Sequence, residues 1–214
     1  MRLVSILDFD GTIVYEDVFE RLLDEFTKED WRYYDYLVER GELSLEEAVN
    51  RQFQLISYAG IDRLLEASKK YLKMRSGFLD FADFCYENNI DLVIASAGLD
   101  FYIYYLLNSH DIKAICHCMH VLEEDGKLKL IAPDFDRSKF RNFKQAIVKE
   151  YINKGYSPIY IGDGFNDFWA AKEAWLVFAV ENSVLEKKCA DARLRFKSFK
   201  HFSEIKQLLL EILS

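Results

Sequence analysis

Short apolar runs alternate with longer amphipathic stretches along most of the chain. Runs of this length that are rich in Val and Ile are typical of buried strands, since helices are usually longer. The runs that we interpret as buried strands are 3–7, 92–95, 158–161 and 176–180. Between them, apolar residues recur at helical spacing, as in a stripe at Phe78, Phe81, Ala82 and Cys85. The alternation of strand and helix predicts an α/β fold with a doubly wound parallel sheet.

One block of the chain, residues 15–75, contains no strand signal. Helical spacing covers 17–26, 31–40, 44–57 and 61–74. The third of these stretches opens with a capping box, in which Ser44 accepts from a first-turn amide and Glu47 reaches back. So much helix exceeds what a crossover between two parallel strands requires. We therefore expect an α/β core domain, residues 1–14 and 76–214, and an inserted helical cap domain, residues 15–75.

Further elements of both kinds are predicted after the cap. They are helices at 99–108 and 140–154, a helix from Ser183, a hairpin at 121–131 and a final helix. The hairpin is predicted because Asp125 and Gly126 favour a tight turn. The final helix is amphipathic, with one face formed by Phe202, Ile205, Leu208, Leu209 and Ile212.

Composition and charge narrow the classes of function. Of 214 residues, 50% are hydrophobic, which is enough for one good core and a small accessory domain. The formal net charge of −8 argues against general binding of nucleic acids. No apolar run is long enough to span a membrane, and the start of the chain leads directly into a strand, so we expect a cytoplasmic enzyme. Four cysteines are too few for a disulfide framework, and we expect reduced thiols.

Polar turns follow three of the predicted strands. Asp8 and Asp10 come after the first, and Gly11 then allows a sharp turn. The second strand ends in the Ser-Ala-Gly sequence 96–98, and the third in the acidic sequence 162–167. Ligands of open parallel sheets bind at the carboxyl ends of the strands, so these turns are expected to meet in one crevice. Two carboxylates placed close together there need a cation or take part in chemistry.

These residues resemble the motifs of the haloacid dehalogenase-like superfamily of phosphotransferases. The motifs are an Asp-x-Asp-Gly-Thr sequence at 8–12, Ser96 after a hydrophobic strand, Lys144, and the acidic sequence at 162–167. The helical insert is similar to the C1-type cap of that superfamily, and the acidic motif is similar to its phosphoserine phosphatase branch. Residues 96–107 and 41–49 are also similar to phosphatases of methionine salvage.

The resemblance and the chemistry of the residue types imply a phosphatase mechanism. A carboxylate can attack a phosphate monoester if a metal screens its charge, so Asp8 is the expected nucleophile, forming a phosphoaspartate. Asp10 is placed to protonate the leaving oxygen and then to deprotonate water. Mg²⁺ is the expected ion because it prefers hard oxygen ligands, here the side chains of Asp8 and Asp163. The resemblance adds the Asp10 carbonyl as a third ligand.

The remaining positions of the motifs are expected to hold the phosphate and to organise the site. Ser96, Ala97 and Gly98 would bind phosphate oxygens close to the start of a helix, where amides are free. Lys144 would balance the charge on Asp8 and on the phosphoryl group, although other lysines lie near it. The residues expected to orient Lys144 or a metal-bound water are Asn166 and Asp167, and Asp167 has the alternative role of a helix-terminal acid.

The substrate is expected to be a small phosphorylated metabolite that the cap selects. Asp17 stands where related phosphoserine phosphatases carry an acid for the substrate amine, and Arg51 stands near their carboxylate-binding Arg. For each residue the alternative is ordinary surface charge. A phosphomutase would use the same core residues, and a catalytically silent scaffold is a further alternative. Dehalogenase chemistry is disfavoured, because displacing a halide needs neither the acid Asp10 nor a metal.

A second cluster, Cys116, Cys118 and His120, would share one face of a strand. Zinc is bound by such residue types, but the spacing is tighter than in most structural zinc sites and no fourth ligand is evident. Buried thiols with a surface histidine are the favoured interpretation. The methionine-salvage relatives carry a Cys-rich stretch before the motif lysine that is absent here, which leaves the exact substrate open.

Overall fold

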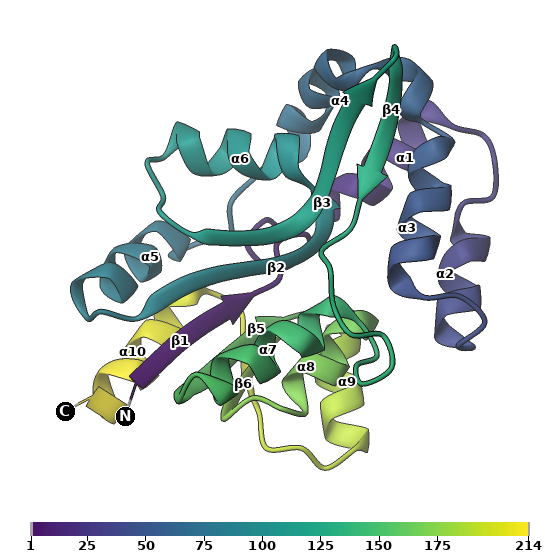
Figure 1. Cartoon of the computed structure of the whole chain (residues 1–214). Coiled ribbons are helices and arrows are strands. Elements are labelled where there is room, and N and C mark those ends of the chain that lie inside the picture. Colours follow the sequence, from purple (N-terminus) through teal and green to yellow (C-terminus); the bar gives the residue numbers. More distant parts are fainter. Residues whose placement is uncertain (1, 214) are drawn as a thin grey trace.

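The computed structural model describes residues 2–213 and contains a seven-stranded sheet with helices packed against it (Figure 1). The strands are β1 (Arg2–Leu7), β2 (Asp91–Leu99), β3 (Ile115–Glu124), β4 (Lys127–Ile131), β5 (Tyr156–Gly162), β6 (Leu176–Val180) and β7 (Lys197–Phe199). Their order in the sheet is β4-β3-β2-β1-β5-β6-β7, and only β4 pairs antiparallel to its neighbour. The predicted doubly wound α/β fold is therefore confirmed.

β1 is the central strand, and its residues are apolar on both sides for that reason. Val4, Ile6 and Leu7 are fully buried, since helices cover both faces of a parallel sheet. β1 pairs with β2 on one side and with β5 on the other. The chain adds β2 and β3 in one direction and β5 to β7 in the other, so the strand order reverses at β1. Such a reversal opens a crevice at the carboxyl ends of the strands.

The helices of the core form two layers. The first includes α5 (Phe78–Glu87), α6 (Asp100–Ser109) and α10 (Phe202–Leu213), of which α5 and α10 pack together. The second contains α7 (Phe143–Asn153), α8 (Phe168–Ala171) and α9 (Val184–Asp191), with α8 touching both of its neighbours. Figure 1 shows the second layer in green beside β5 and β6.

Residues 15–75 form a group of short helices beyond the carboxyl end of β1 (Figure 1). These are α1 (Val18–Phe26), α2 (Arg32–Glu39), α3 (Leu45–Gln54) and α4 (Ile61–Ser68), with 3-10 turns at Ser57–Ala59 and Lys69–Tyr71. The segment leaves and rejoins the rest of the chain at one place, where Val14 and Met74 form an isolated bridge. The Tyr15 amide donates to the Lys73 carbonyl at 3.0 Å, so the two connections run side by side.

Several boundaries differ from those predicted. β2 continues to Leu99, so residues 96–98 belong to the strand, and β3 begins at Ile115, six residues before the predicted hairpin. The predicted helix 44–57 ends at Gln54, the helix 61–74 ends at Ser68, and the helix 140–154 begins only at Phe143. The short strand β7 was not predicted, because it pairs with β6 through only three positions and carries no alternating pattern. Within residues 2–213, no helix is long and apolar enough to cross a membrane.

Candidate active site

Asp8 is the first residue after β1, and its position is tied to the sheet. Its amide donates to the carbonyl of Ile161 on β5 at 2.9 Å, which continues the strand pairing by one residue. Its Oδ1 accepts from the Phe9 amide at 2.7 Å, and its Oδ2 accepts from Lys144 Nζ at 2.6 Å. The residue is 8% exposed and lines a pocket. Asp8 is thus a fixed carboxylate with one edge open to a ligand.

Lys144 lies between two carboxylates. It comes from the second position of α7, is only 2% exposed, and donates to Asp8 and to Asp167 Oδ1, the latter at 2.7 Å. Asp167 is fully buried and also accepts from the Tyr160 hydroxyl at 2.7 Å and from the amides of residues 163 and 164. Both Asp167 oxygens are therefore occupied by donors, which suits a residue that orients Lys144.

Asp163 completes a group of three carboxylates. Oxygen atoms of Asp8, Asp163 and Asp167 all lie within 4.8 Å of one another. Asp163 Oδ1 accepts from the Thr12 hydroxyl at 2.6 Å. Gly11 has φ +70°, and a side chain there would overlap with the Asp163 carboxylate. The turn after β1 and the turn after β5 are thus in direct contact, and glycine is required where they meet.

Burial and the neighbouring carboxylates raise the pKa values of two members of this group. Burial is the largest cause at Asp8, the Asp167 carboxylate adds to it, and the pKa rises to about 7 despite Lys144. The pKa of Asp163 is raised well above its usual value, first by burial and then by Asp167 and Asp8. At Asp167 burial also acts to raise the pKa, but the Lys144 ammonium and hydrogen bonds hold it below its usual value. Three carboxylates share one ammonium, so the donor set and its charge fit a hard divalent cation.

Asp10 has different neighbours from Asp8. Its Oδ1 accepts from the Val18 amide at 3.1 Å, and its Oδ2 accepts from the Tyr102 hydroxyl at 2.6 Å. A side chain at Gly98 would overlap with both Asp10 and Tyr102. Burial, then the Asp17 carboxylate, raises the pKa of Asp10 well above its usual value. A carboxyl group whose pKa is raised holds its proton more readily and is suited to act as a general acid. The predicted role of the Asp10 carbonyl as a metal ligand stays a prediction.

Residues 96–98 line the same pocket as the two aspartates. Ser96 is 1% exposed, and its Oγ accepts from the Gly98 amide at 3.0 Å. α6 begins two residues later, at Asp100, with an acid in its first turn. The register of β2 against β3 is irregular between Ala95 and Leu99, so backbone groups of this stretch are released from regular pairing.

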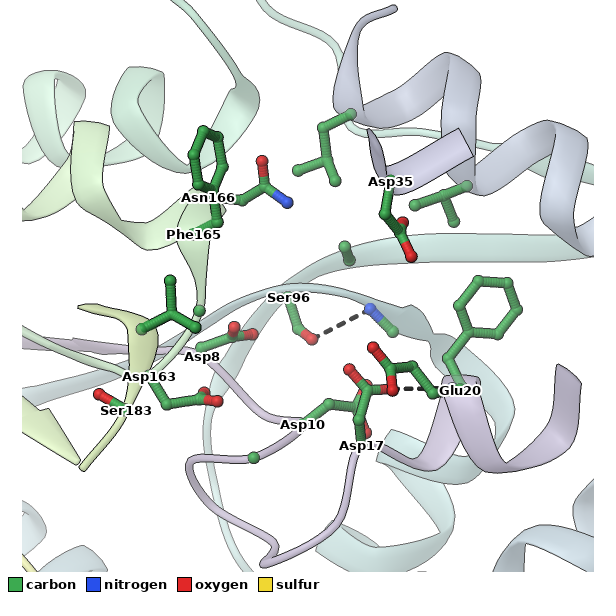
Figure 2. Close-up of a pocket in the computed structure, with 18 of the residues that line it drawn as sticks. Asp8, Asp10, Asp17, Glu20, Asp35, Ser96, Asp163, Phe165, Asn166 and Ser183 are labelled. Carbon is green, nitrogen blue, oxygen red and sulfur yellow. Dashed lines mark hydrogen bonds between the residues drawn. The ribbon is translucent and has the colours of Figure 1, made fainter. Parts of the chain in front are cut away.

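The pocket has a volume of about 620 Å³ and lies between the core and the helices of residues 15–75. All three predicted turns reach it, as the sheet topology requires. Its opposite wall combines apolar side chains, among them Phe19, Leu23 and Trp31, with acidic ones. The acids of this wall are Asp17, Glu20, Asp35 and Glu39. In Figure 2, the carboxylates of Asp17, Glu20 and Asp35 lie around the same opening, across from Asp8 and Asp163.

Of the two predicted substrate residues, Asp17 lines the pocket and Arg51 does not. Asp17 lines the pocket and is also the N-cap of α1, where it accepts from the Glu20 amide at 2.8 Å. Solvent reaches it through the pocket, but burial by the surrounding chain and the Glu20 carboxylate raise its pKa to about 7. Arg51 is exposed in the last turn of α3 and is not among the residues that line the pocket. Asn166 lines the pocket, and its carbonyl accepts from Asn142 at 2.9 Å.

The cysteine and histidine cluster does not assemble into a metal site. Cys118 is buried in β3, Cys116 is half-buried, and His120 lies 3.2 Å from an oxygen of Asp100. Among the described acidic, Cys and His side chains, the group close enough to share an ion is the aspartate triad. The favoured interpretation of thiols in the core fits this arrangement.

Two residues of the site were missed by the sequence reasoning. Tyr102 resembled any core aromatic of an amphipathic helix, yet it bonds Asp10. Arg75 was not singled out, yet its guanidinium donates to the carbonyls of Thr12 and Gly11 at 2.8 and 2.6 Å, and the residue lines the pocket. Neither role has a local sequence signal, because each depends on contacts across more than sixty positions of the chain.

Two curated relatives are similar to this chain over nearly its whole length. The 2-hydroxy-3-keto-5-methylthiopentenyl-1-phosphate phosphatase of Bacillus cereus strain B4264 is 29% identical over 222 aligned positions, which cover 99% of each chain. The enzyme of the same name from Bacillus anthracis is 28% identical over 217 positions, covering 100% of this chain and 98% of that one.

Solved structures share the fold. A substrate-bound phosphoserine phosphatase superposes with a TM-score of 0.76 at 18% identity and covers 97% of this chain and 98% of its own. Phosphoserine phosphatase from T. onnurineus gives a TM-score of 0.71 at 16% identity, with 97% and 94% covered. The family model of haloacid dehalogenase-like hydrolases matches residues 6–172. The chain therefore belongs to the haloacid dehalogenase-like hydrolase family.

Proposed function

We propose that this protein is a Mg²⁺-dependent phosphatase that hydrolyses a small phosphomonoester through a phosphoaspartate on Asp8. The observation that carries the proposal is the shared position of Asp8, Lys144 and Asp163 in the lining of one pocket, with the fully buried Asp167 bonded to Lys144. The full-length likeness to phosphatases of the same family supports it.

The first half-reaction transfers the phosphoryl group to Asp8. A carboxylate oxygen of Asp8 attacks phosphorus, the ester P–O bond breaks, and Asp10 gives its proton to the departing oxygen. Lys144, held at 2.6 Å from Asp8, offsets negative charge on the nucleophile and on the transferred group. Ser96 and the Gly98 amide, which bonds Ser96 Oγ before a ligand binds, are the donors for phosphate oxygens.

The second half-reaction releases phosphate. Asp10, now ionised, takes a proton from water, and the resulting hydroxide attacks the phosphorus of the phosphoaspartate. The Asp8–phosphorus bond breaks and restores the free carboxylate. The same residue thus acts first as acid and then as base, which is consistent with its two hydrogen-bond donors and its raised pKa.

The metal would be held by Asp8 and Asp163, with Asp167 as the residue that keeps Lys144 and the turn in place. Mg²⁺ supplies charge screening between the nucleophile and a dianionic substrate when it is bound. Asp163 Oδ1 is fixed by Thr12, which leaves its other oxygen for the ion. The proposal that residues 15–75 form a cap domain is supported by their single point of connection at Val14 and Met74.

The wall of the pocket restricts the rest of the substrate. Lys144 and Arg75 are the cationic side chains among the described residues that line the pocket; Lys144 bonds Asp8, and Arg75 bonds the turn after β1. Four carboxylates and several apolar groups face them from residues 15–75. We therefore propose a substrate without a carboxylate at its far end, carrying an apolar or amine-bearing group. Arg51 is not part of this proposal.

The test is phosphate release from a panel of esters with Mg²⁺ or EDTA. The panel contains an aryl phosphate, phosphoserine, an amino-alcohol phosphate and a neutral alkyl phosphate. Wild type is expected to be active only with Mg²⁺, and Asp8→Asn is expected to lose at least ~10³-fold in kcat. Equal activity of the variant would remove Asp8 as nucleophile. Transfer of the phosphoryl group to a second sugar without phosphate release would identify a mutase instead.

A further inference from the structure

Glu46 is a buried carboxylate outside the site described above. It occupies the second position of α3, where a charged side chain would ordinarily face solvent, yet it is 4% exposed. Its neighbour Glu47 is exposed and completes the capping box with Ser44 inside the cap. Glu46 instead contacts two groups of the core, the Phe143 amide and the Arg137 guanidinium.

The first contact is with the start of α7. Glu46 Oε1 accepts from the Phe143 amide at 3.4 Å. Amides in the first turn of a helix have no partner within the helix, and a carboxylate there is favoured by the helix dipole. The side chain of the N-cap residue Asn142 accepts from the Gln145 amide at 3.0 Å. Glu46 therefore supplies a second acceptor for the first-turn amides, from another part of the chain. α7 is thus capped jointly by its own residue and by residues 15–75.

The second contact compensates the charge of Glu46. Arg137 Nη1 lies 3.2 Å from Glu46 Oε2. The Arg137 side chain is 56% exposed, so the pair has one buried and one hydrated member. A buried carboxylate is stable only when hydrogen bonds and an opposite charge compensate it. The Phe143 amide and the Arg137 guanidinium therefore maintain the position of Glu46 together.

We infer that Glu46 is a positioning residue, which ties the cap to the first turn of α7 and thereby holds Lys144 between Asp8 and Asp167 while the cap covers the pocket. This inference rests on the proposed function. Lys144 directly follows Phe143, so a shift of the first turn of α7 moves the Lys144 backbone as well. Lys144 Nζ bonds two carboxylates at 2.6 and 2.7 Å, and such short charged contacts depend strongly on position.

The kinetic test compares variants of two adjacent acids on one helix. Glu46→Ala is expected to lower kcat for an aryl phosphate about tenfold with KM changed less than about twofold, since the lost contact orders a transition-state group. Glu46→Gln keeps an oxygen for the Phe143 amide and is expected to restore kcat to within about threefold of wild type. Glu47→Ala weakens α3 without touching α7, and is expected to stay within about twofold of wild type.

A double-mutant cycle with Lys144→Ala separates positioning from general damage. If Glu46 acts through Lys144, Glu46→Ala has less than about a twofold further effect on kcat in the Lys144→Ala background. A further tenfold loss there would overturn the inference, as would a Glu46→Ala enzyme with wild-type kcat.

Amide hydrogen exchange gives a readout that needs no activity. The first-turn amides of α7 are expected to exchange at least ~10-fold faster in Glu46→Ala than in wild type, and unchanged in Glu47→Ala. Unchanged exchange in Glu46→Ala would overturn the inference even if the protein hydrolyses no ester. If wild type hydrolyses no ester but the first-turn amides still exchange faster in Glu46→Ala than in wild type, the contact is supported and the proposed function is not.

Discussion

Asp8 and Asp10 are separated by one residue, yet their side chains have different neighbours. Asp8 is bonded by a cation, Lys144, whereas Asp10 is bonded by a neutral hydroxyl and an amide. An ammonium favours an ionised carboxylate, while a buried site without a cation favours the protonated form. The two environments fit a nucleophile and a proton donor, respectively.

Tyr102 offers a test of this difference. Tyr102→Phe removes the donor to Asp10 Oδ2, and that donor lowers the Asp10 pKa. Loss of a hydrogen bond to an ionisable group is expected to lower kcat by about tenfold. The limb of the pH–kcat profile that reports Asp10 is expected to move to higher pH. The control is Tyr104→Phe on the same helix, which is 37% exposed and should leave the profile unchanged. A Tyr102→Phe enzyme with the wild-type profile would contradict the role assigned to Asp10.

At the scale of elements, the turn after β1 is the contact between the two acidic motifs. Gly11 and Gly126 both have φ +70°, but only Gly11 has other atoms where a side chain would stand. An L-residue in that conformation costs about 1–2 kcal/mol in unfolding free energy at either position. The additional overlap with Asp163 is specific to Gly11.

This pair of glycines gives a matched prediction. Gly126→Ala, at the tip of the β3–β4 hairpin, is expected to lose about 1–2 kcal/mol in urea unfolding with unchanged activity. Gly11→Ala is expected to lose more stability and at least ~100-fold in kcat, because Asp163 must move. Equal losses for the two variants would show that the contact between the turns is unimportant.

At the scale of the whole molecule, folding brings three aspartates from two turns, after β1 and after β5, close to one lysine. The pKa values of two of them are raised above those of an unfolded chain, to about 7 for Asp8 and well above the usual value for Asp163. The folded state therefore binds more protons than the unfolded state between about pH 4 and pH 7. The metal-free protein is stabilised below this window, and that stability is lost as the pH rises through it.

We expect the melting temperature of the metal-free protein to fall between pH 5.5 and pH 8. Mg²⁺ should raise it more at pH 8, where the carboxylates are ionised, than at pH 5.5. Asp163→Asn removes one charge of the group, so its melting temperature should depend less on pH and on Mg²⁺. Calorimetry with and without the ion measures both effects. An Asp163→Asn protein with the same Mg²⁺ response as wild type would exclude Asp163 as a ligand.

The amino-acid sequence by itself determined the class of fold and the order of the polar turns. Buried strands such as β1 are recognisable because their apolar residues are contiguous. Asp8 and Asp163 directly follow two such strands, whereas Ser96 lies inside β2. Boundaries were less predictable. The end of β2 and the start of β3 depend on pairing with each other across an irregular register, which a local pattern does not contain.

Only the tertiary structure decided which side chains meet. Arg51 was a candidate for the pocket through the resemblance to phosphoserine phosphatases, but the orientation of α3 leaves it exposed. The same orientation buries Glu46 against α7. Tyr102 and Arg75 reach the turn after β1 across 92 and 64 positions of the chain. Local periodicity specifies which residues share a face of an element, whereas the packing of elements determines what that face touches, and the site is built from such contacts.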